Sequence, residues 1–346
     1  MDSTIATILA QDGIVNGAIY ALLGLAIVLV FSVTRVIMVP QGEFVTFGAL
    51  TFAMLQAGRI PGTLFLLVGA SLWVAAGSLF NLVAGKARLG KAHLPNVLQA
   101  LLPAIAALIL VFVLDAPRRG PWLQILTTMV IVVPLGPLLY RIVYAPLASS
   151  SILVLLIVSV AVHLGLESMG LLFFGAEGYR TPVLFDFSLT IGSLFLSGAA
   201  VSVVAVAAVL MILLSFGFGA TIFGKALRAT ASNPVGARIV GIRADRAGGI
   251  AFTIAAFIGV LCGLLIGPIT TIYYDGGFLI ALKGFVAAII GGLSSYPLAA
   301  IGAISVGLSE SVASFYASAF KDAIVFALTL PVLLWLSFRM PHREEG

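Results

Sequence analysis

One short stretch of the sequence comes close to a phosphate-binding motif. Gly219, Gly224 and Lys225 have the spacing G-x-x-x-x-G-K, in which backbone N–H groups and a lysine cradle phosphates. The motif also requires a Ser or Thr after the lysine to hold magnesium, and a short buried strand before the glycines. Ala226 replaces the hydroxyl, and the preceding segment 194–216 has the length of a membrane helix. We therefore expect no nucleotide site in this chain.

Ionisable side chains in or beside apolar segments are a second kind of candidate. Glu43, Glu167, Lys283 and Glu310 have such positions, and charges at membrane depth usually face a cavity or a partner. We expect Lys283 to pair with Glu310 or Glu43, and Glu167 to meet His163 one turn earlier on the same helical face. A structural pair is the first expectation, and direct contact with a transported molecule is the alternative.

Helix breaks add candidates for a transport path. Gly42 follows Pro40, and the ends of broken helices are where transporters place polar substrate groups. Asn16 and Tyr20 lie one turn apart on the first apolar segment, where they either form core hydrogen bonds or contact substrate. The complete set of translocation-path candidates is Asn16, Tyr20, Gln41, Gly42, Glu43, Lys283 and Glu310.

The sequence shows no constellation for catalysis or for a metal. His93, His163 and His342 are isolated from one another and from the single cysteine, Cys262, whereas zinc sites need closely spaced ligands. There is also no nucleophile elbow or other hydrolytic motif. We expect a protein that is not an enzyme, with no catalytic and no metal-binding residues.

The composition indicates a membrane protein. Hydrophobic residues make up 61% of the 346 residues and charged residues only 9%, with a mean hydropathy of +1.21, so too few charges remain to cover a soluble surface. The net charge of +5 comes from short basic clusters between apolar runs. Such clusters are typical of membrane topology signals, and we expect no nucleic-acid partner.

The apolar runs predict an all-α membrane bundle of about 10–11 transmembrane helices, some of them broken or re-entrant. A β-barrel would need alternating strands of about ten residues, and none is visible. We expect one transmembrane domain over 1–346. The expected spans are 12–33, 42–58, 63–84, 97–114, 121–144, 151–174, 194–216, 249–271, 279–293, 297–316 and 322–339.

The basic residues also predict an orientation. With the C-terminus in the cytoplasm and the N-terminus outside, 12 of the 18 Lys and Arg residues lie on the cytoplasmic side, as the positive-inside rule expects. The pair Arg118–Arg119 is an exception. Small residues at four-residue spacing, such as Gly13 with Gly17 and Gly259 with Gly263, predict close helix packing within the membrane.

The segment 217–248 is the longest polar stretch, and it predicts a short cytoplasmic helix. Ser232-Asn233-Pro234 supplies a capping side chain and a proline suited to the first turn. Gly241 stands where a left-handed residue ends a helix. A helix of about two turns flanked by basic residues is more organised than a topology signal needs, which favours docking of a partner.

The same stretch, "GKALRATASNPVGARIVGIRADR", resembles the cytoplasmic segment of high-affinity branched-chain amino acid ABC transporter permeases. There a G-[KR]-A-x-R-A-x-A-x-[ND]-x-x-A-x-x-x-G-I pattern forms the helix that docks into the ATPase. The segments "NGAIYALLGLAIVLVFSVTRVI", "QGEFVTFGAL" and "LKGFVAAIIGGLSSYPLAAIGAISVGLSESVASFY" resemble the same family in the same order. The resemblance covers nearly the whole chain except about 60–120.

The chain departs from the family pattern in three places. Met38 and Gln41 stand where the family often has Asn and His, and Ser232 stands where an acid is common. Residues 60–120 resemble an inserted pair of apolar segments, which predicts an extra transmembrane hairpin.

The resemblance implies a permease subunit of an ATP-binding cassette importer in the bacterial inner membrane. ATP and magnesium would then bind to separate ATPase subunits, and this chain would hold no cofactor. Other implied partners are a second, related permease in a heterodimer, a periplasmic substrate-binding protein, and membrane lipid. The residues that the resemblance assigns to ATPase docking are Arg228, Ala229, Ser232, Asn233, Pro234, Ala237, Arg238, Gly241 and Ile242.

The implied substrate is a branched-chain amino acid such as leucine, or a related small amino acid, amide, urea or carboxylate. An ion-coupled secondary transporter, with protons carried by the buried glutamates, is the alternative. An intramembrane enzyme or lipid-handling protein is a further alternative, disfavoured because a catalytic set is missing.

Overall fold

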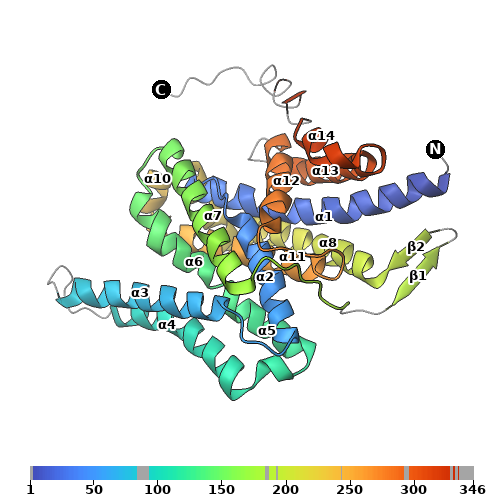
Figure 1. The fold of residues 1–346 in the computed structure, drawn as a ribbon. Helices are drawn as coiled ribbons and strands as arrows, with labels where there is room; N and C mark the ends of the chain where they lie inside the picture. Colours follow the sequence, from blue (N-terminus) through green and yellow to red (C-terminus); the bar gives the residue numbers. More distant parts are fainter. Residues whose placement is uncertain are drawn as a thin grey trace.

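The computed structural model describes residues 3–83, 93–183, 187–191, 194–242, 244–291, 296–327, 330–331 and 334. These ranges form a helical bundle with one small β-hairpin (Figure 1). As predicted, the protein is a polytopic helical membrane protein. Among the described residues, seven helical segments of at least 18 residues are apolar enough to cross a membrane: Thr4–Thr34, Thr63–Phe80, Pro121–Leu147, Ile152–Phe174, Gly198–Phe218, Arg246–Ile266 and Pro297–Tyr316.

The core of the bundle forms around α1 (Ser3–Thr34), which packs against α11 (Ala244–Ile266), α12 (Gly276–Ile290) and α13 (Tyr296–Tyr316). The helix α2 (Gln41–Gln56) packs against α11 and α12 and is buried along almost its whole length. With 16 residues, at 1.5 Å per residue, α2 is too short to cross a hydrocarbon core of about 30 Å. As predicted, some apolar helices are shorter than ordinary spans.

The predicted stripes of small residues form the helix contacts. A Cβ atom on Gly13 would lie 2.8 Å from the Cα of Leu308, and one on Gly17 would lie 2.9 Å from the Cα of Ile304. Gly307 faces both glycines from α13. On α11, Gly263 meets the backbone of α2 in the same way. Because no side chain separates these backbones, the helices approach closely, as small residues allow in membranes.

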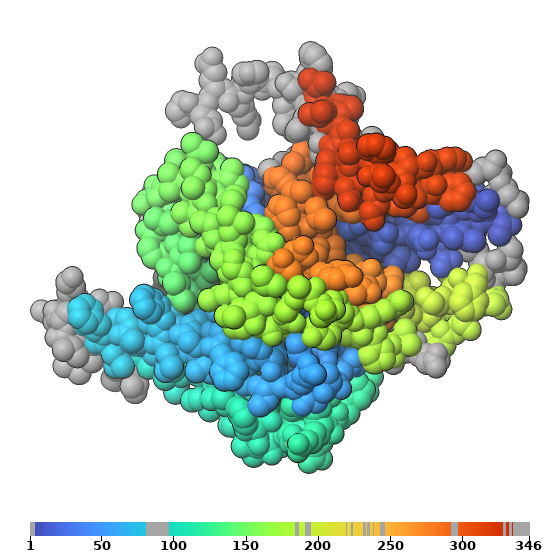
Figure 2. Space-filling model, in the orientation of Figure 1, coloured from blue at the N-terminus to red at the C-terminus, as the bar shows by residue number. Residues whose placement is uncertain are grey.

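A helical hairpin extends from one edge of the bundle, where α3 (Thr63–Val83) packs against α4 (His93–Leu108) (Figures 1 and 2). The chain continues through η1 (Ile109–Val113) and η2 (Ala116–Arg118). Large apolar side chains such as Phe65, Trp73 and Phe80 are exposed on α3. In a membrane protein, such a surface faces lipid.

The next part of the chain crosses the bundle through a run of short helices: α5 (Pro121–Val132), α6 (Leu135–Leu139), η3 (Tyr140–Tyr144) and η4 (Ala145–Leu147). The longer helix α7 (Ile152–Phe174) follows. Ser151 accepts a hydrogen bond from the Val154 N–H and caps α7, and Gly175, at φ = 79°, ends it.

A β-hairpin is an element that the apolar pattern did not predict. Strands β1 (Ser188–Ile191) and β2 (Leu194–Ser197) pair antiparallel, with Ser188 opposite Ser197. The expected span 194–216 therefore starts as a strand, and its helix, α8 (Gly198–Ala220), begins later. Gln11 on α1 donates a 3.2 Å hydrogen bond to the Phe195 carbonyl, which fixes the hairpin beside the N-terminal end of α1.

After α8, the chain forms α9 (Ile222–Ser232) and α10 (Pro234–Ile239). Gly219 lies in α8, whereas Gly224 and Lys225 lie in the first turn of α9. The Gly224 N–H donates to Thr221 Oγ1 at 3.0 Å, so this amide caps its own helix. The near-motif thus joins two helices, as expected, and does not follow a strand. The described C-terminal part adds η5 (Ser318–Phe320) and α14 (Lys321–Ala327); the expected span 322–339 lies largely outside the described residues.

Candidate translocation site and capped helix

A cleft of about 770 Å³ opens beside the N-terminal half of α1. Its walls come from α1, α12, α13, the loop before α12 and the start of α14. The polar side chains that line it are Asp12, Asn16, Tyr20, Thr270, Thr271, Lys283, Glu310, Ser311, Ser314, Lys321 and Asp322. The cleft therefore brings together four of the predicted path residues: Asn16, Tyr20, Lys283 and Glu310.

A cluster of charges lies in this cleft. Lys283 Nζ forms an ion pair with Glu310 Oε1, and it also lies 2.9 Å from Asp322 Oδ1. The Tyr20 hydroxyl donates to Glu310 Oε2 at 2.5 Å. Lys283 and Glu310 are only 5% and 6% exposed. The predicted pairing of Lys283 with Glu310 is thus confirmed, and it is Tyr20, from the first helix, that orients the carboxylate.

Close helix packing places these three side chains together. A Cβ atom on Gly284, next to Lys283, would lie 2.7 Å from the Leu23 Cβ, and one on Gly24 would lie 2.9 Å from the Gly284 carbonyl oxygen. The α1 and α12 backbones are therefore nearly in contact one turn from Tyr20. Gly307 in the same way brings the α13 backbone against that of α1, one turn before Glu310.

Asp322 is the residue of this cluster that sequence reasoning missed. Asp322 is the first residue of the expected span 322–339, and it was not among the translocation-path candidates. In the structure it lies in the first turn of α14, and its side chain, 37% exposed, reaches Lys283 from the edge of the cleft. A carboxylate at the start of an apolar segment was the available signal, but sequence does not show which way that segment folds back.

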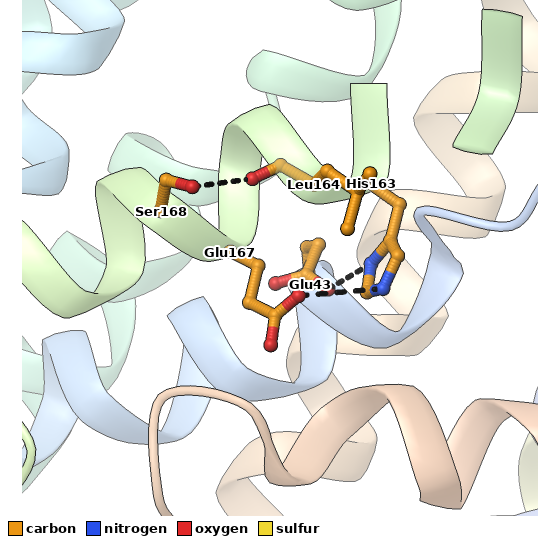
Figure 3. A network of polar contacts seen from close by, with 5 residues as sticks. All are labelled: Glu43, His163, Leu164, Glu167 and Ser168. Atoms are coloured by element: carbon orange, nitrogen blue, oxygen red, sulfur yellow. Dashed lines mark hydrogen bonds and ion pairs between the residues drawn. The ribbon is translucent and has the colours of Figure 1, made fainter. Parts of the chain in front are cut away.

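A second polar cluster, which lies outside the cleft lining, connects α2 to α7 (Figure 3). His163 Nδ1 lies 2.8 Å from Glu43 Oε1, and His163 Nε2 lies 3.6 Å from Glu167 Oε2. The predicted proximity of His163 and Glu167 is confirmed, whereas Glu43 pairs with His163 and not with Lys283. Phe278 of α12 stacks on the imidazole, with 4.4 Å between ring centroids. Three helices therefore meet at His163.

The remaining path candidates also lie outside the cleft lining. Gln41 is fully buried, and its amide donates to the Ala255 carbonyl of α11 at 3.0 Å. Gly42 packs against the backbone of Gly277, so that the first turns of α2 and α12 touch. In this structure, these residues serve helix packing.

The short helix predicted within 217–248 is present as α10 (Pro234–Ile239). Asn233 Oδ1 accepts a hydrogen bond from the Gly236 N–H at 2.8 Å and caps its start. Gly241 has φ = +87°, and the Ile242 N–H donates to the Ala237 carbonyl at 2.9 Å. This bond and the left-handed glycine are those of a Schellman C-cap. The predicted start and stop are both confirmed.

Part of the segment 217–248 presents apolar side chains to its surroundings. Ile239 and Val240, at the end of α10, are 82% and 73% exposed, whereas Ala237 is buried. Arg228 on α9 is exposed, and Ala229 is half-buried. The side chains of Ser232, Pro234 and Arg238 are not among those that the structure describes. Adjacent exposed apolar residues beside polar ones are a feature of protein interaction sites.

The sequence comparison identifies the family. Residues 9–333 match the family described as branched-chain amino acid transport system / permease component. The chain belongs to this family. It is 31% identical over 214 residues to the high-affinity branched-chain amino acid transport system permease protein LivH of Salmonella typhimurium, covering 59% of this chain and 69% of the relative. The corresponding values for LivH of Escherichia coli K12 are the same.

The permease BraD of Pseudomonas aeruginosa is 27% identical over 213 residues, again covering 59% of this chain and 69% of the relative. No solved structure matches the chain. The family makes this protein a transport permease, a transport subunit rather than an enzyme. The cleft lining carries two lysines and three carboxylates, so it offers partners to groups of either charge: Lys283, Lys321, Asp12, Glu310 and Asp322.

Proposed function

We propose that this permease is the membrane-spanning subunit of an ATP-binding cassette importer. Its substrate is a branched-chain amino acid or a related small amino acid, amide or carboxylate. The relatives named above are branched-chain amino acid permeases, and the charged cleft suits such a substrate. The whole chain acts as one membrane domain, with 217–248 as its coupling segment and the α3–α4 hairpin as an extra membrane element.

The capped helix α10 is the observation that supports ATPase coupling. A short helix fixed at both ends by caps holds its shape while a neighbouring subunit moves, and Ile239 and Val240 give it an apolar contact surface. The docking surface comprises Arg228, Ala229, Ser232, Asn233, Pro234, Ala237, Arg238, Gly241 and Ile242, together with these two residues. ATP and magnesium bind to the ATPase subunits, and this chain binds neither.

The two ends of the molecule suit different partners. The cleft lies beside the N-terminal end of α1 and the β-hairpin, whereas α10 lies at the opposite end (Figure 1). In the proposed orientation, the N-terminus and the cleft face the periplasm, where a substrate-binding protein delivers its ligand. The C-terminus and α10 face the cytoplasm of a bacterial inner membrane, and a second, related permease completes the complex.

ATP can drive transport only if the open and closed states of the ATPase bind it with different affinities. A ligand shifts the equilibrium between two conformations only by the difference in its affinity for them. Closure of the ATPase subunits on ATP would displace α10. The helices α8, α9 and α11, which contact α10 or one another, would pass this motion to α1 and α12 and alternate the access of the cleft.

Co-purification in mild detergent tests this proposal. The tagged parent chain should recover a Walker-containing ATPase and ATP hydrolysis activity from its native membrane. Ile239→Glu places a charge on the exposed apolar surface of α10, so we expect it to lose the ATPase. Ile222→Glu, at an isoleucine of α9 that is 86% exposed, is the matched control and should retain it.

The opposite result would overturn ATPase coupling. Recovery of the parent chain alone, under conditions that preserve a known ABC complex, would favour ion-coupled transport. The glutamates of the His163 cluster would then be the residues to replace, with uptake measured against an imposed proton gradient. Equal loss of the ATPase from both variants would instead extend the docking surface to Ile222 in the first turn of α9.

A further inference from the structure

The two carboxylates that contact Lys283 differ in how firmly they are held. Glu310 is 6% exposed and contacts both Lys283 and the Tyr20 hydroxyl. The side chain of Asp322 is 37% exposed, and its described ion pair is the one with Lys283, at 2.9 Å. Asp322 also lies on α14, a helix of seven residues. Asp322 is therefore the partner of Lys283 that can be exchanged.

We propose that Asp322 is an exchangeable counter-ion that selects zwitterionic substrates. This inference rests on the proposed function. When an α-amino acid enters the cleft, its carboxylate replaces that of Asp322 at Lys283, and its ammonium group pairs with the released Asp322 carboxylate. Glu310 stays on Lys283 and keeps its hydrogen bond from Tyr20. One ion pair is thereby replaced by two, with no charge left buried and unpaired.

The charge balance of the cleft explains which ligands are rejected. Lys283, Glu310 and Asp322 together carry one positive and two negative charges, and Asp12 and Lys321, which also line the cleft, have opposite signs. A zwitterion leaves this balance unchanged. A monocarboxylate of the same shape adds a second excess negative charge, displaces Asp322 and gives it no new partner. Such an unpaired charge is a means of discriminating against a wrong ligand.

The test compares leucine with 4-methylpentanoate, which has the same side chain and carboxylate but no ammonium group. Radiolabelled leucine is bound at equilibrium to the purified transporter complex in lipid nanodiscs, and 4-methylpentanoate competes with it. The substrate-binding protein is left out because it would select the ligand itself. We expect the wild-type complex to prefer leucine.

In Asp322→Asn, leucine loses its ammonium partner, whereas the monocarboxylate no longer displaces an anion. We therefore expect the affinity ratio of leucine to 4-methylpentanoate to fall at least about tenfold, a factor that equals roughly 1.4 kcal/mol. Asp322→Glu keeps the charge and should restore much of the ratio. Asp115→Asn removes an aspartate that is paired with Arg118 outside the cleft, and this control should keep the wild-type ratio.

The possible outcomes separate this inference from the proposed function. An unchanged ratio in Asp322→Asn overturns the counter-ion role, even if the complex imports leucine. If Asp322→Asn does not fold, the ratio in Asp322→Glu and in Asp322→Ser decides in its place, and equal ratios overturn the role. If the complete importer, with its binding protein, takes up neither an amino acid nor a related amide or carboxylate, the proposed substrate class fails.

Discussion

At the scale of single residues, the buried acidic and basic side chains in the described part of the chain form two groups that do not share a member. Lys283 is paired within the cleft, and His163 bridges Glu43 and Glu167 away from it. The attraction within each pair compensates for the cost of removing charges from water only while both partners are present. The individual ion pairs are therefore sensitive to removal of one partner.

Removal of the cleft cation should show this sensitivity. Lys283→Met leaves the Glu310 carboxylate buried without a cation, and we expect a loss of about 3–5 kcal/mol in stability. The double variant Lys283→Met with Glu310→Gln should lose less, because no unpaired charge remains. Thermal unfolding of the purified protein in detergent measures both.

A surface pair is the control for this experiment. Arg118→Met breaks the 3.4 Å pair with Asp115, in which the Arg118 side chain is 81% exposed. Exposed pairs contribute at most about 1 kcal/mol. If Lys283→Met and Arg118→Met had equal, small effects, Lys283 would not be holding the helices together.

Sequence reasoning found part of each group for a physical reason. Lys283 and Glu310 stand out because few charged residues lie in apolar runs. Since few carboxylates lie in such runs, the possible partners of Lys283 are also few. His163 and Glu167 are four residues apart, so helix geometry brings them together. Glu43 lies 120 positions from His163, and no local pattern indicates which of two distant polar residues will meet.

At the scale of elements, the apolar runs predicted nearly every long helix, because lipid requires helices with internally satisfied backbones. The capped helix α10 was also predictable, since its caps are local features of the sequence. The β-hairpin was missed because Leu194–Ser197 is apolar and continues directly into α8. Hydropathy alone does not distinguish such a strand from the first turn of a span.

The close packing of α1 and α13 predicts that a larger residue at Gly307 destabilises the protein. A Cβ atom on Gly307 would lie 2.8 Å from the Gly17 Cα, and neither backbone can move aside without separating the helices. We expect Gly307→Ala to destabilise the protein by about 1–3 kcal/mol, as overpacking does. The melting temperature in detergent should fall accordingly.

Gly77 on α3 provides the matched control, because a Cβ atom there would meet nothing within 4 Å. Gly77→Ala should leave stability unchanged or raise it by up to about 1 kcal/mol, since alanine favours the helix. Equal losses in the two variants would mean that the effect belongs to glycine in general and that the α1–α13 contact adds nothing.

At the scale of the whole molecule, the bundle has a buried centre and a broad apolar exterior. The central helices α1 and α2 are largely enclosed, whereas α3, α4, α7 and α8 carry many exposed large apolar side chains. The sequence showed that these runs were apolar but not which of them lay inside, because a membrane helix is apolar on every side.

Trp73 provides a test of this arrangement. It lies near the middle of α3 with 71% of its surface exposed, so it should contact lipid near the centre of the membrane. In a variant with Trp122 and Trp335 replaced by Phe, we expect lipids brominated deep in their acyl chains to quench its fluorescence strongly. Stronger quenching by headgroup-level bromine would contradict a spanning α3.

The short helix α12 has a consequence for the molecule as a whole. Its first turn touches Gly42 and stacks on His163, and Lys283 follows five residues after Phe278, about 7.5 Å along the axis. A helix is stiff over so short a distance, so α12 connects the His163 group rigidly to the Lys283 group. We therefore expect a rearrangement at His163 to be transmitted through α12 to the charged groups of the cleft.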